Sequence, residues 1–195
     1  MNKRKQAALD TRKKLLEVGE RLIAEKGFDN VSVEDITEES VLSKGSFYTY
    51  FPHKEDIVYH VSLDAFDGLK EETLAMKDTG IAERLRRYTY KFMEGVERYG
   101  IMICRQWVRN EICEDDCGKL IYDLSSLRYI LEAAVAEGKL SEDAPVETLT
   151  YMITSGLYEM MTCWCMSGGK FEPKDHTDEF FFAGLEKALA PYVTE

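Results

Sequence analysis

The segment from Ser43 to Lys54 is rich in side chains that can bind phosphate groups and the edges of nucleotide bases. Its hydroxyl and ammonium groups include those of Ser43, Ser46, Tyr48, Tyr50, Lys44 and Lys54. Hydroxyl oxygens and ammonium groups are common partners of DNA phosphates and bases. The segment is therefore a candidate nucleic-acid-binding element, with a solvated amphipathic helix as the alternative.

The spacing of apolar residues indicates which side of this segment faces outward. On a helical wheel that starts at Lys44, Phe47 and Phe51 fall together on the apolar side. Gly45, Tyr48 and Thr49 fall on the opposite arc. A glycine inside a helix costs about 1 kcal/mol relative to alanine, so Gly45 suggests that another molecule approaches the backbone closely.

Three helices are predicted to position these groups. Apolar residues recur at helical spacing over Thr11–Lys26, and Gly27 suits the end of that helix. Ser32 is a good N-cap for a second helix, and Ser43 caps a third that Pro52 stops. The last two are short and joined by a short turn, which predicts a helix-turn-helix. The N–H groups at their starts can receive phosphate oxygens.

The formal net charge of −11 does not exclude DNA binding, because the charge is unevenly distributed. Residues 1–14 hold six basic side chains and one acidic one, a net of +5. Residues 1–60 hold 10 basic and 11 acidic residues, whereas the rest hold 15 and 25. The acidic excess therefore lies in the C-terminal two-thirds and does not describe the surface near Ser43.

Residues 11–60 resemble the DNA-binding domain of TetR-family (tetracycline-repressor-like) transcriptional repressors. The family pattern is a helix ending in Glu-Lys-Gly-aromatic, a Ser/Thr-capped helix, and then Ser-Lys-Gly-Ser/Thr-hydrophobic-Tyr-X-Tyr/His-Phe-X-X-Lys. The matching segments are Ala24-Glu25-Lys26-Gly27-Phe28, Ser32-Val33-Glu34-Asp35-Ile36 and Ser43-Lys44-Gly45-Ser46-Phe47-Tyr48-Thr49-Tyr50-Phe51-Pro52-His53-Lys54-Glu55. The match covers about a quarter of the chain, almost without gaps.

The resemblance implies a role for each matching position. Lys44, Gly45, Ser46 and Tyr48 are expected in the major groove, and Thr49, at a variable position, is a candidate specificity residue. Phosphate contacts are expected from Ser32, Ser43, Tyr50 and Lys54. The basic residues Lys3-Arg4-Lys5 form an arm for a minor groove or phosphates, or else a solvated terminus.

The chain departs from the family pattern in the turn, where Ala-Gly-Val is replaced by Ser40-Val41-Leu42. A β-branched valine tolerates a positive φ badly, so the turn must take another geometry or carry strain. Glu38 and Glu39 add negative charge beside the same surface. Both features argue against tight DNA binding and leave the expected fold unchanged.

The whole chain is expected to be all-α, with about nine helices and no sustained strand pattern. Residues 1–53 form the expected helix-turn-helix DNA-binding domain, and 54–195 the helical ligand-binding and dimerisation domain. The helices expected in the second domain are Lys54–Met76, Ile81–Tyr99, Ile101–Ile112, Gly118–Gly138, Pro145–Ser167 and Thr177–Val193.

Family architecture implies a small-molecule pocket and a homodimer. The candidate pocket residues are aromatic and methionine side chains, which make adaptable walls: Phe66, Tyr88, Phe92, Met102, Trp107, Tyr129, Tyr158 and Met161. Acidic surroundings would favour a cationic hydrophobic ligand. The candidate dimer residues lie on apolar stripes of the last two helices: Leu149, Met152, Ile153, Leu157, Met160, Phe181, Leu185 and Leu189.

These features predict a ligand-responsive regulator, most simply a repressor, that binds a pseudo-palindromic operator as a homodimer and is released by a small hydrophobic effector. The alternative is a helical dimeric binding module, or a thiol or metal sensor based on the 5 cysteines, with weak or no DNA binding. No catalytic motif, cofactor site or metal site is expected, and no membrane partner. The absence of a signal peptide or apolar span predicts a cytoplasmic location.

Overall fold

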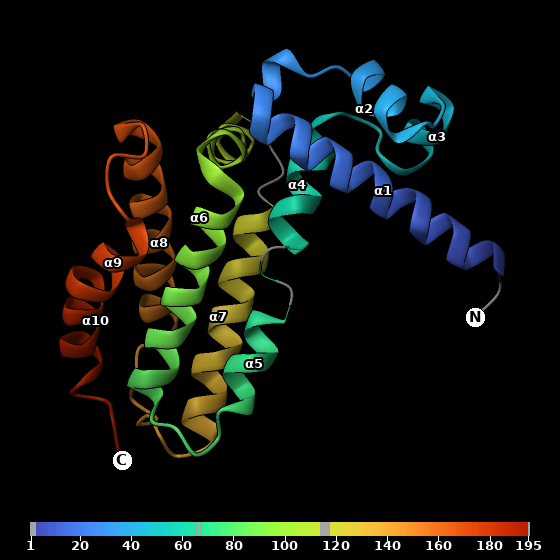
Figure 1. Ribbon diagram of the computed structural model, residues 1–195. Coiled ribbons are helices and arrows are strands. Elements are labelled where there is room, and N and C mark those ends of the chain that lie inside the picture. The colour runs from blue at the N-terminus through green and yellow to red at the C-terminus, as the bar shows by residue number, and fades with distance from the viewer. Residues whose placement is uncertain (1–2, 65, 67, 114–117, 195) are drawn as a thin grey trace.

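The computed structural model describes residues 3–64, 66, 68–113 and 118–194. These residues form helices joined by short loops, with one isolated β-bridge between Leu140 and Val193, which confirms the all-α expectation (Figure 1). The α-helices are α1 Lys3–Lys26, α2 Val33–Ser40, α3 Lys44–Tyr50, α4 Glu55–Asp64, α5 Leu69–Ala75, α6 Ile81–Cys113, α7 Gly118–Ala136, α8 Val146–Ser167, α9 Pro173–His176 and α10 Phe182–Leu189. A 3-10 turn spans Phe28–Asn30, and a π-helical segment, Thr177–Phe181, joins α9 to α10 without a break.

The first three helices pack into a small unit with its own apolar core. Leu15 and Ile23 of α1, Ile36 of α2, and Phe47 and Phe51 around α3 are fully buried. Helix α1 begins at Lys3, so the expected start at Thr11 is wrong. The basic residues near the N-terminus are a helical continuation of α1 and not an extended arm.

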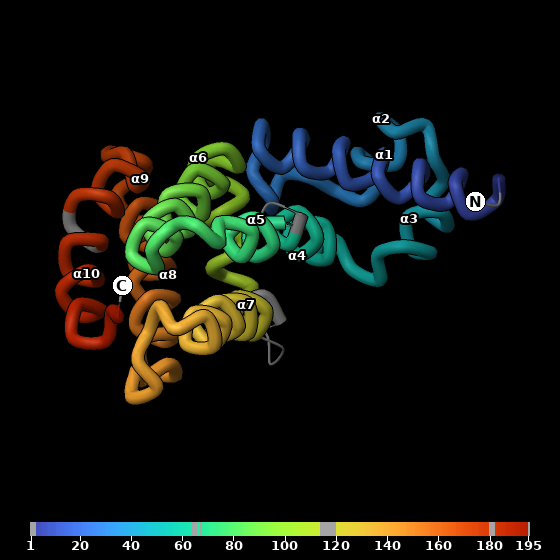
Figure 2. Tube along the Cα trace, turned by 90° about the horizontal axis from the view of Figure 1, so that it is seen from below, coloured from blue at the N-terminus to red at the C-terminus, as the bar shows by residue number. Residues whose placement is uncertain are grey.

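Helix α4 links this unit to the rest of the protein, and a glycine allows the close contact. A Cβ added at Gly19 of α1 would lie 2.9 Å from Cγ2 of Ile57 in α4. That distance is too short for two carbon atoms, so α1 and α4 can approach this closely only because residue 19 has no side chain. Figure 2 shows α4 running from the N-terminal helices to the side of α6 and α7.

The second unit is a bundle of α5 to α10, and its helix breaks differ in part from those expected. The single helix expected over Lys54–Met76 is two helices, because Gly68 takes a positive φ of 81° and starts α5. The break expected at Gly100 is confirmed, since its φ of 75° and ψ of 167° kink α6. The last helical segment begins at Pro173 and ends at Leu189, before the expected Val193.

The end of the bundle far from α1–α3 is held by a fully buried arginine. Arg84 donates to the backbone carbonyls of Thr79 and Lys77, each at 2.9 Å, and pairs with Glu137 at the end of α7 at 2.9 Å. Because a buried guanidinium is stable only with such partners, Arg84 ties the α5–α6 loop to the end of α7.

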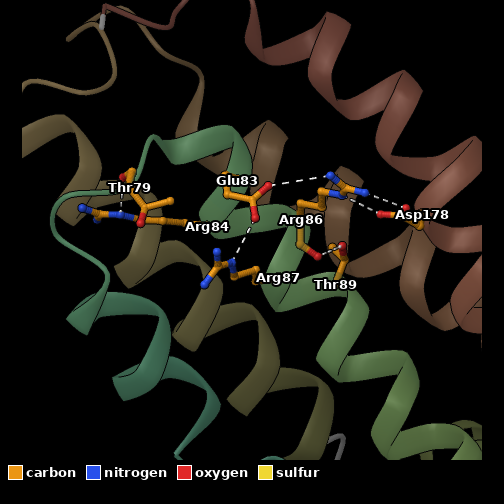
Figure 3. Close-up of polar contacts among 7 residues, drawn as sticks. All are labelled: Thr79, Glu83, Arg84, Arg86, Arg87, Thr89 and Asp178. Carbon is orange, nitrogen blue, oxygen red and sulfur yellow. Dashed lines mark hydrogen bonds and ion pairs between the residues drawn. The ribbon is translucent and has the colours of Figure 1, made fainter.

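One arginine on α6, Arg86, joins the bundle to its terminal segment (Figure 3). Arg86 makes a bidentate pair with Asp178 at 2.7 and 2.9 Å. Hydrogen bonding from that guanidinium lowers the pKa of the Asp178 carboxyl. Arg87 bonds to Glu83 one turn earlier. These contacts fix the terminal segment, Pro173–Leu189, along the outer side of α6.

Candidate DNA-binding surface and ligand cleft

Helix α3 presents a polar outer face over an apolar inner one. Phe47 is fully buried, whereas Lys44, Gly45, Tyr48 and Thr49 are exposed. Tyr48 exposes 54% of its surface, although the edge of its ring meets Phe47. The residues predicted from the wheel to face outward therefore do so, although their DNA contacts stay a prediction.

Local hydrogen bonds hold the start of α3. The Ser43 hydroxyl accepts from the Ser46 backbone N–H at 3.0 Å and also bonds the Ser46 hydroxyl. Thr49 Oγ1 donates to the Gly45 carbonyl at 2.8 Å. These bonds stabilise α3 by capping and leave the faces of Gly45 and Tyr48 open to another molecule.

The space around Gly45 supports the idea of close approach from outside. A Cβ added there would meet only Ser43 Oγ, at an ordinary contact distance of 3.7 Å. The protein's own packing therefore does not require glycine at this position. Glycine at this position costs the helix about 1 kcal/mol relative to alanine. Because no contact inside the protein requires a glycine here, the close approach of another molecule is the better explanation for it.

Helix α2 begins with a complete capping box. Ser32 Oγ accepts from the Asp35 N–H at 3.1 Å, and Asp35 Oδ2 accepts from the Ser32 N–H at 2.7 Å. Hydrogen bonds from Ser32 lower the pKa of the Asp35 carboxyl. The Ser32 hydroxyl also donates to Asp35 at 2.6 Å, so a phosphate would have to compete for it.

Charged side chains on this surface are paired with each other. Lys44 bonds Glu34, and Arg21 bonds Glu39. The negative charge of Glu39 is thus partly compensated by Arg21. Both pairs are exposed to solvent and therefore weak, so a DNA phosphate can replace the Glu34 carboxylate at Lys44.

Lys54 has a role that its position in the family pattern does not suggest. Its Nζ donates to the carbonyls of Phe28 and Val31, at 2.8 and 2.7 Å, and lies 3.9 Å from the centroid of the Phe28 ring. These contacts tie the start of α4 to the α1–α2 loop. Tyr50 is half-buried and packs on the core. The phosphate contacts predicted for both residues stay predictions, and for Lys54 they compete with this link.

The turn before α3 contains Val41 in the left-handed conformation, with φ 56° and ψ 42°. Val41 is the only non-glycine with positive φ in the part of the chain that the structure describes. Of the two possibilities open from the sequence, strain is thus correct and another turn geometry is wrong. Its side chain is 83% exposed, so no packing energy offsets the strain.

Four of the predicted pocket residues form one aromatic cluster inside the bundle. Phe66 stacks on Phe92 with centroids 4.5 Å apart, and Trp107 lies 5.6 Å from Phe66 and 5.7 Å from Tyr158. Tyr88 and Met161 are also buried. Met102 and Tyr129 are exposed instead, Met102 near Gly27 and Tyr129 beside Lys70, so neither lies in this cluster.

A cleft of about 450 Å³ opens beside this cluster, between α4 and the second half of α6. Trp107 is the only predicted pocket residue among its described lining side chains. Others are His53, Glu55 and Asp56 at the start of α4, Tyr59 further along it, and Asn110 and Glu111 on α6. No spacing in the sequence signals this cleft, because the two lining segments lie about 50 residues apart.

Comparison with known proteins identifies the family. Residues 15–61 match the family described as bacterial regulatory proteins, tetR family, which is the region that contains α2, α3 and the capped turns. Over this quarter of the chain the protein is similar to the TetR family. This confirms the resemblance carried by Ser43–Glu55.

Relatives and solved structures agree with that assignment. An uncharacterised HTH-type transcriptional regulator, YuxN of Bacillus subtilis strain 168, is 26% identical over 173 residues, which cover 85% of this chain and 59% of YuxN. The chain spans about half the length of the curated relatives it matches.

Two crystal structures show the same fold. A TetR-family regulator from Mesorhizobium loti has a TM-score of 0.75 at 16% identity, over 96% of this chain and 98% of that one. FadR of Bacillus subtilis in complex with stearoyl-CoA has a TM-score of 0.67 at 21% identity, over 91% and 97%.

The last helices of the chain offer a different surface from the one expected. Leu149, Ile153, Leu157, Leu185 and Leu189 are buried in the protomer's own core. They cannot contact a second copy, so assigning them to a dimer interface is corrected. Met152 is exposed and Met160 is half-buried, whereas the side chain of Phe181 lies outside the described residues.

The described thiols divide into a buried pair and an exposed pair. Cys104 and Cys165 are buried, and burial raises the pKa of both thiols, that of Cys165 to about 11. Cys113 and Cys163 are exposed, and Cys117 lies outside the described residues. The described part holds no group of three or more metal-ligating side chains. None of its helices is long and apolar enough to cross a membrane.

Proposed function

We propose that the protein is a ligand-responsive repressor that binds a pseudo-palindromic DNA operator as a homodimer. The observation that carries the proposal is the outer face of α3. Lys44, Gly45, Tyr48 and Thr49 are exposed there, and packing within the chain does not require a glycine at position 45. The match of residues 15–61 to the tetR family of bacterial regulatory proteins supports the same assignment.

Two copies of α3 are needed to read a site of this kind. Two-fold related recognition helices reach successive major grooves when they lie about 34–36 Å apart. The surface we assign to dimerisation is the exposed stripe of α8, which includes Tyr151, Met152 and Met166. At Gly184 of α10, a Cβ would meet no side chain and no backbone from outside its own helix turn within 4 Å among the described residues, which leaves room for a second copy.

Ligand control would act through α4. This helix begins directly after α3 and packs Ile57 against Gly19 of α1, and Lys54 holds its first turn to the α1–α2 loop. A ligand that binds better to a tilted α4 would move α3 with it and change the distance between the two α3 helices. Only a difference in affinity between the two states can produce release.

Selection of the purified protein against random duplex DNA tests the proposal. We expect an inverted repeat whose half-site centres lie one helical turn apart, with binding that weakens steeply as salt rises. A selected single site without symmetry would refute the dimeric reader. Failure to enrich any sequence, from protein shown to be folded and dimeric, would refute DNA recognition by α3.

A further inference from the structure

The polar side chains in the first turn of α3 already have partners within the protein. The Ser43 and Ser46 hydroxyls bond each other, with 3.0 Å between their oxygen atoms, and Ser46 is half-buried. The Lys44 ammonium group pairs with Glu34 of α2. A base edge that is read by these hydroxyl and ammonium groups therefore has to compete with contacts that the protein makes on its own.

Thr49, in the second turn of α3, turns a methyl group outward. Its Oγ1 donates to the Gly45 carbonyl at 2.8 Å, which directs the hydroxyl back along the helix. Oγ1 and Cγ2 are attached to the same Cβ in staggered positions, so the methyl group points away from that hydrogen bond. The side chain of Thr49 is exposed. Thr49 thus offers an approaching molecule an apolar group, while its hydroxyl hydrogen is used within the helix.

An open notch lies beside this methyl group. Gly45 and Thr49 are one turn apart on the same exposed side of α3, and side chains four residues apart on a helix are neighbours. A Cβ added to Gly45 would meet only Ser43 Oγ outside its own helix backbone, at 3.7 Å. We call this space the α3 notch. Its floor is the Cα of Gly45, and one wall is the Cγ2 of Thr49.

We propose that the α3 notch reads thymine through its C5-methyl group. Thymine presents this methyl group in the major groove, and the methyl group of a threonine is a suitable apolar partner for it. A base that places a donor or an acceptor in the notch loses water there without gaining a hydrogen bond from Thr49. Thr49 is then the residue that selects for thymine. This role rests on the proposed function, since α3 must lie in the major groove for the notch to reach a base.

The test uses the duplex that the purified full-length protein selects. Each thymine of a half-site is replaced in turn by uracil, together with its equivalent in the other half-site, and the affinity of the wild type is measured. Uracil keeps the hydrogen-bonding atoms of thymine and lacks only the methyl group. We expect one position at which uracil weakens binding about fourfold for each half-site, or about fifteenfold in all. Equal affinity for uracil at every position, or a selected half-site without thymine, would overturn the proposal.

Two substitutions at Thr49 separate the methyl group from the hydroxyl. Thr49→Ser keeps the hydroxyl and removes the methyl group, so the preference for the thymine duplex over the uracil duplex should fall below about twofold. Thr49→Val removes the hydroxyl and keeps a methyl group, so it should retain the preference. A preference that persists in Thr49→Ser, or one that is lost in Thr49→Val, would overturn the role of the Thr49 methyl group.

A matched control is available at the other end of the molecule. The hydroxyl of Thr194 also donates to a backbone carbonyl, that of Gly138, and its side chain is exposed. Thr194 lies beside the C-terminus, at the end of the bundle far from α3 (Figure 1). Thr194→Ser should therefore leave the preference for thymine unchanged. Circular dichroism checks the folding of every variant.

The two proposals fail in distinguishable ways. If the protein selects an inverted repeat but binds its thymine and uracil forms equally well, thymine reading by the α3 notch is wrong and the dimeric DNA reader remains. If the folded and dimeric protein selects no duplex, the proposed function is wrong, and the assignment of Thr49 fails with it.

Discussion

Replacing Val41 should stabilise the protein, because this valine is held in a conformation that L-residues avoid. The left-handed region costs an L-residue about 1–2 kcal/mol, and glycine carries no such cost. The Leu42 N–H bonds the Thr37 carbonyl at 2.9 Å and the Val41 N–H bonds the Glu38 carbonyl at 3.1 Å, so the turn cannot relax without losing both.

The expected gain follows from two opposing terms. Val41→Gly removes the strain of about 1–2 kcal/mol but increases the backbone freedom of the unfolded chain, which costs about 0.4–1 kcal/mol. Little burial is lost, since the side chain is 83% exposed. Taken at their midpoints, the two terms give a net stabilisation of about 0.8 kcal/mol, or a rise in Tm of roughly 2–3 °C for a chain of this size.

Urea unfolding followed by circular dichroism, at one protein concentration for all variants, measures the effect. Val41→Asn should stabilise by a similar amount, because asparagine tolerates this region. Val41→Ala keeps a Cβ in the strained conformation and should gain less than Val41→Gly. The reasoning is refuted if Val41→Gly is no more stable than the wild type, or if Val41→Ala gains more than Val41→Gly.

Three further predictions follow from contacts elsewhere. Gly19→Ala should destabilise the protein by about 1–3 kcal/mol, because its Cβ would overlap Ile57. Gly184→Ala, at an open helical position, should stabilise the monomer by about 0.5–1 kcal/mol. Urea unfolding measures both effects. A less stable Gly184→Ala monomer, or a Gly19→Ala variant as stable as the wild type, would contradict the packing described at these two glycines. Because the pKa of Asp35 is lower in the folded protein, its ionised carboxylate contributes stability at pH values above its unfolded pKa, and this stability is lost as the pH falls through its folded pKa. Asp35→Asn should therefore flatten the acid side of the curve of stability against pH, and an unchanged curve would contradict this. Cys113 and Cys163 should react with a thiol reagent at once, whereas Cys104 and Cys165 should react only on unfolding, and early modification of the buried pair, read by mass spectrometry, would refute their burial.

Features of the N-terminal unit that depend on neighbouring residues were predictable from the sequence. Ser32 and Ser43 cap helices through bonds to residues three positions on, and such bonds are visible as spacing. Phe47 and Phe51 share the apolar side of one short helix. At Val41 the sequence left either strain or another turn geometry open, because a β-branched residue stands where the family pattern has glycine, and only the structure decides for strain.

Features that depend on distant residues were not predictable in this way. Lys54 bonds carbonyls more than twenty positions earlier, and the cleft joins α4 to α6. Apolar spacing showed that Leu149, Ile153 and Leu157 form a stripe on one helix face, but not whether a protomer or a partner covers it. The start of α1 at Lys3 was missed because charged residues carry no apolar period.

The most direct test of the account measures how one side chain on α3 affects specific and non-specific binding. The affinities of the wild type and of Tyr48→Ala are compared on the selected duplex and on a scrambled duplex of equal length and composition, at the same salt concentration. If α3 reads the DNA, Tyr48→Ala loses about 1–3 kcal/mol on the selected duplex and little on the scrambled one. An equal loss on both, or none on either, would contradict sequence reading by the outer face of α3.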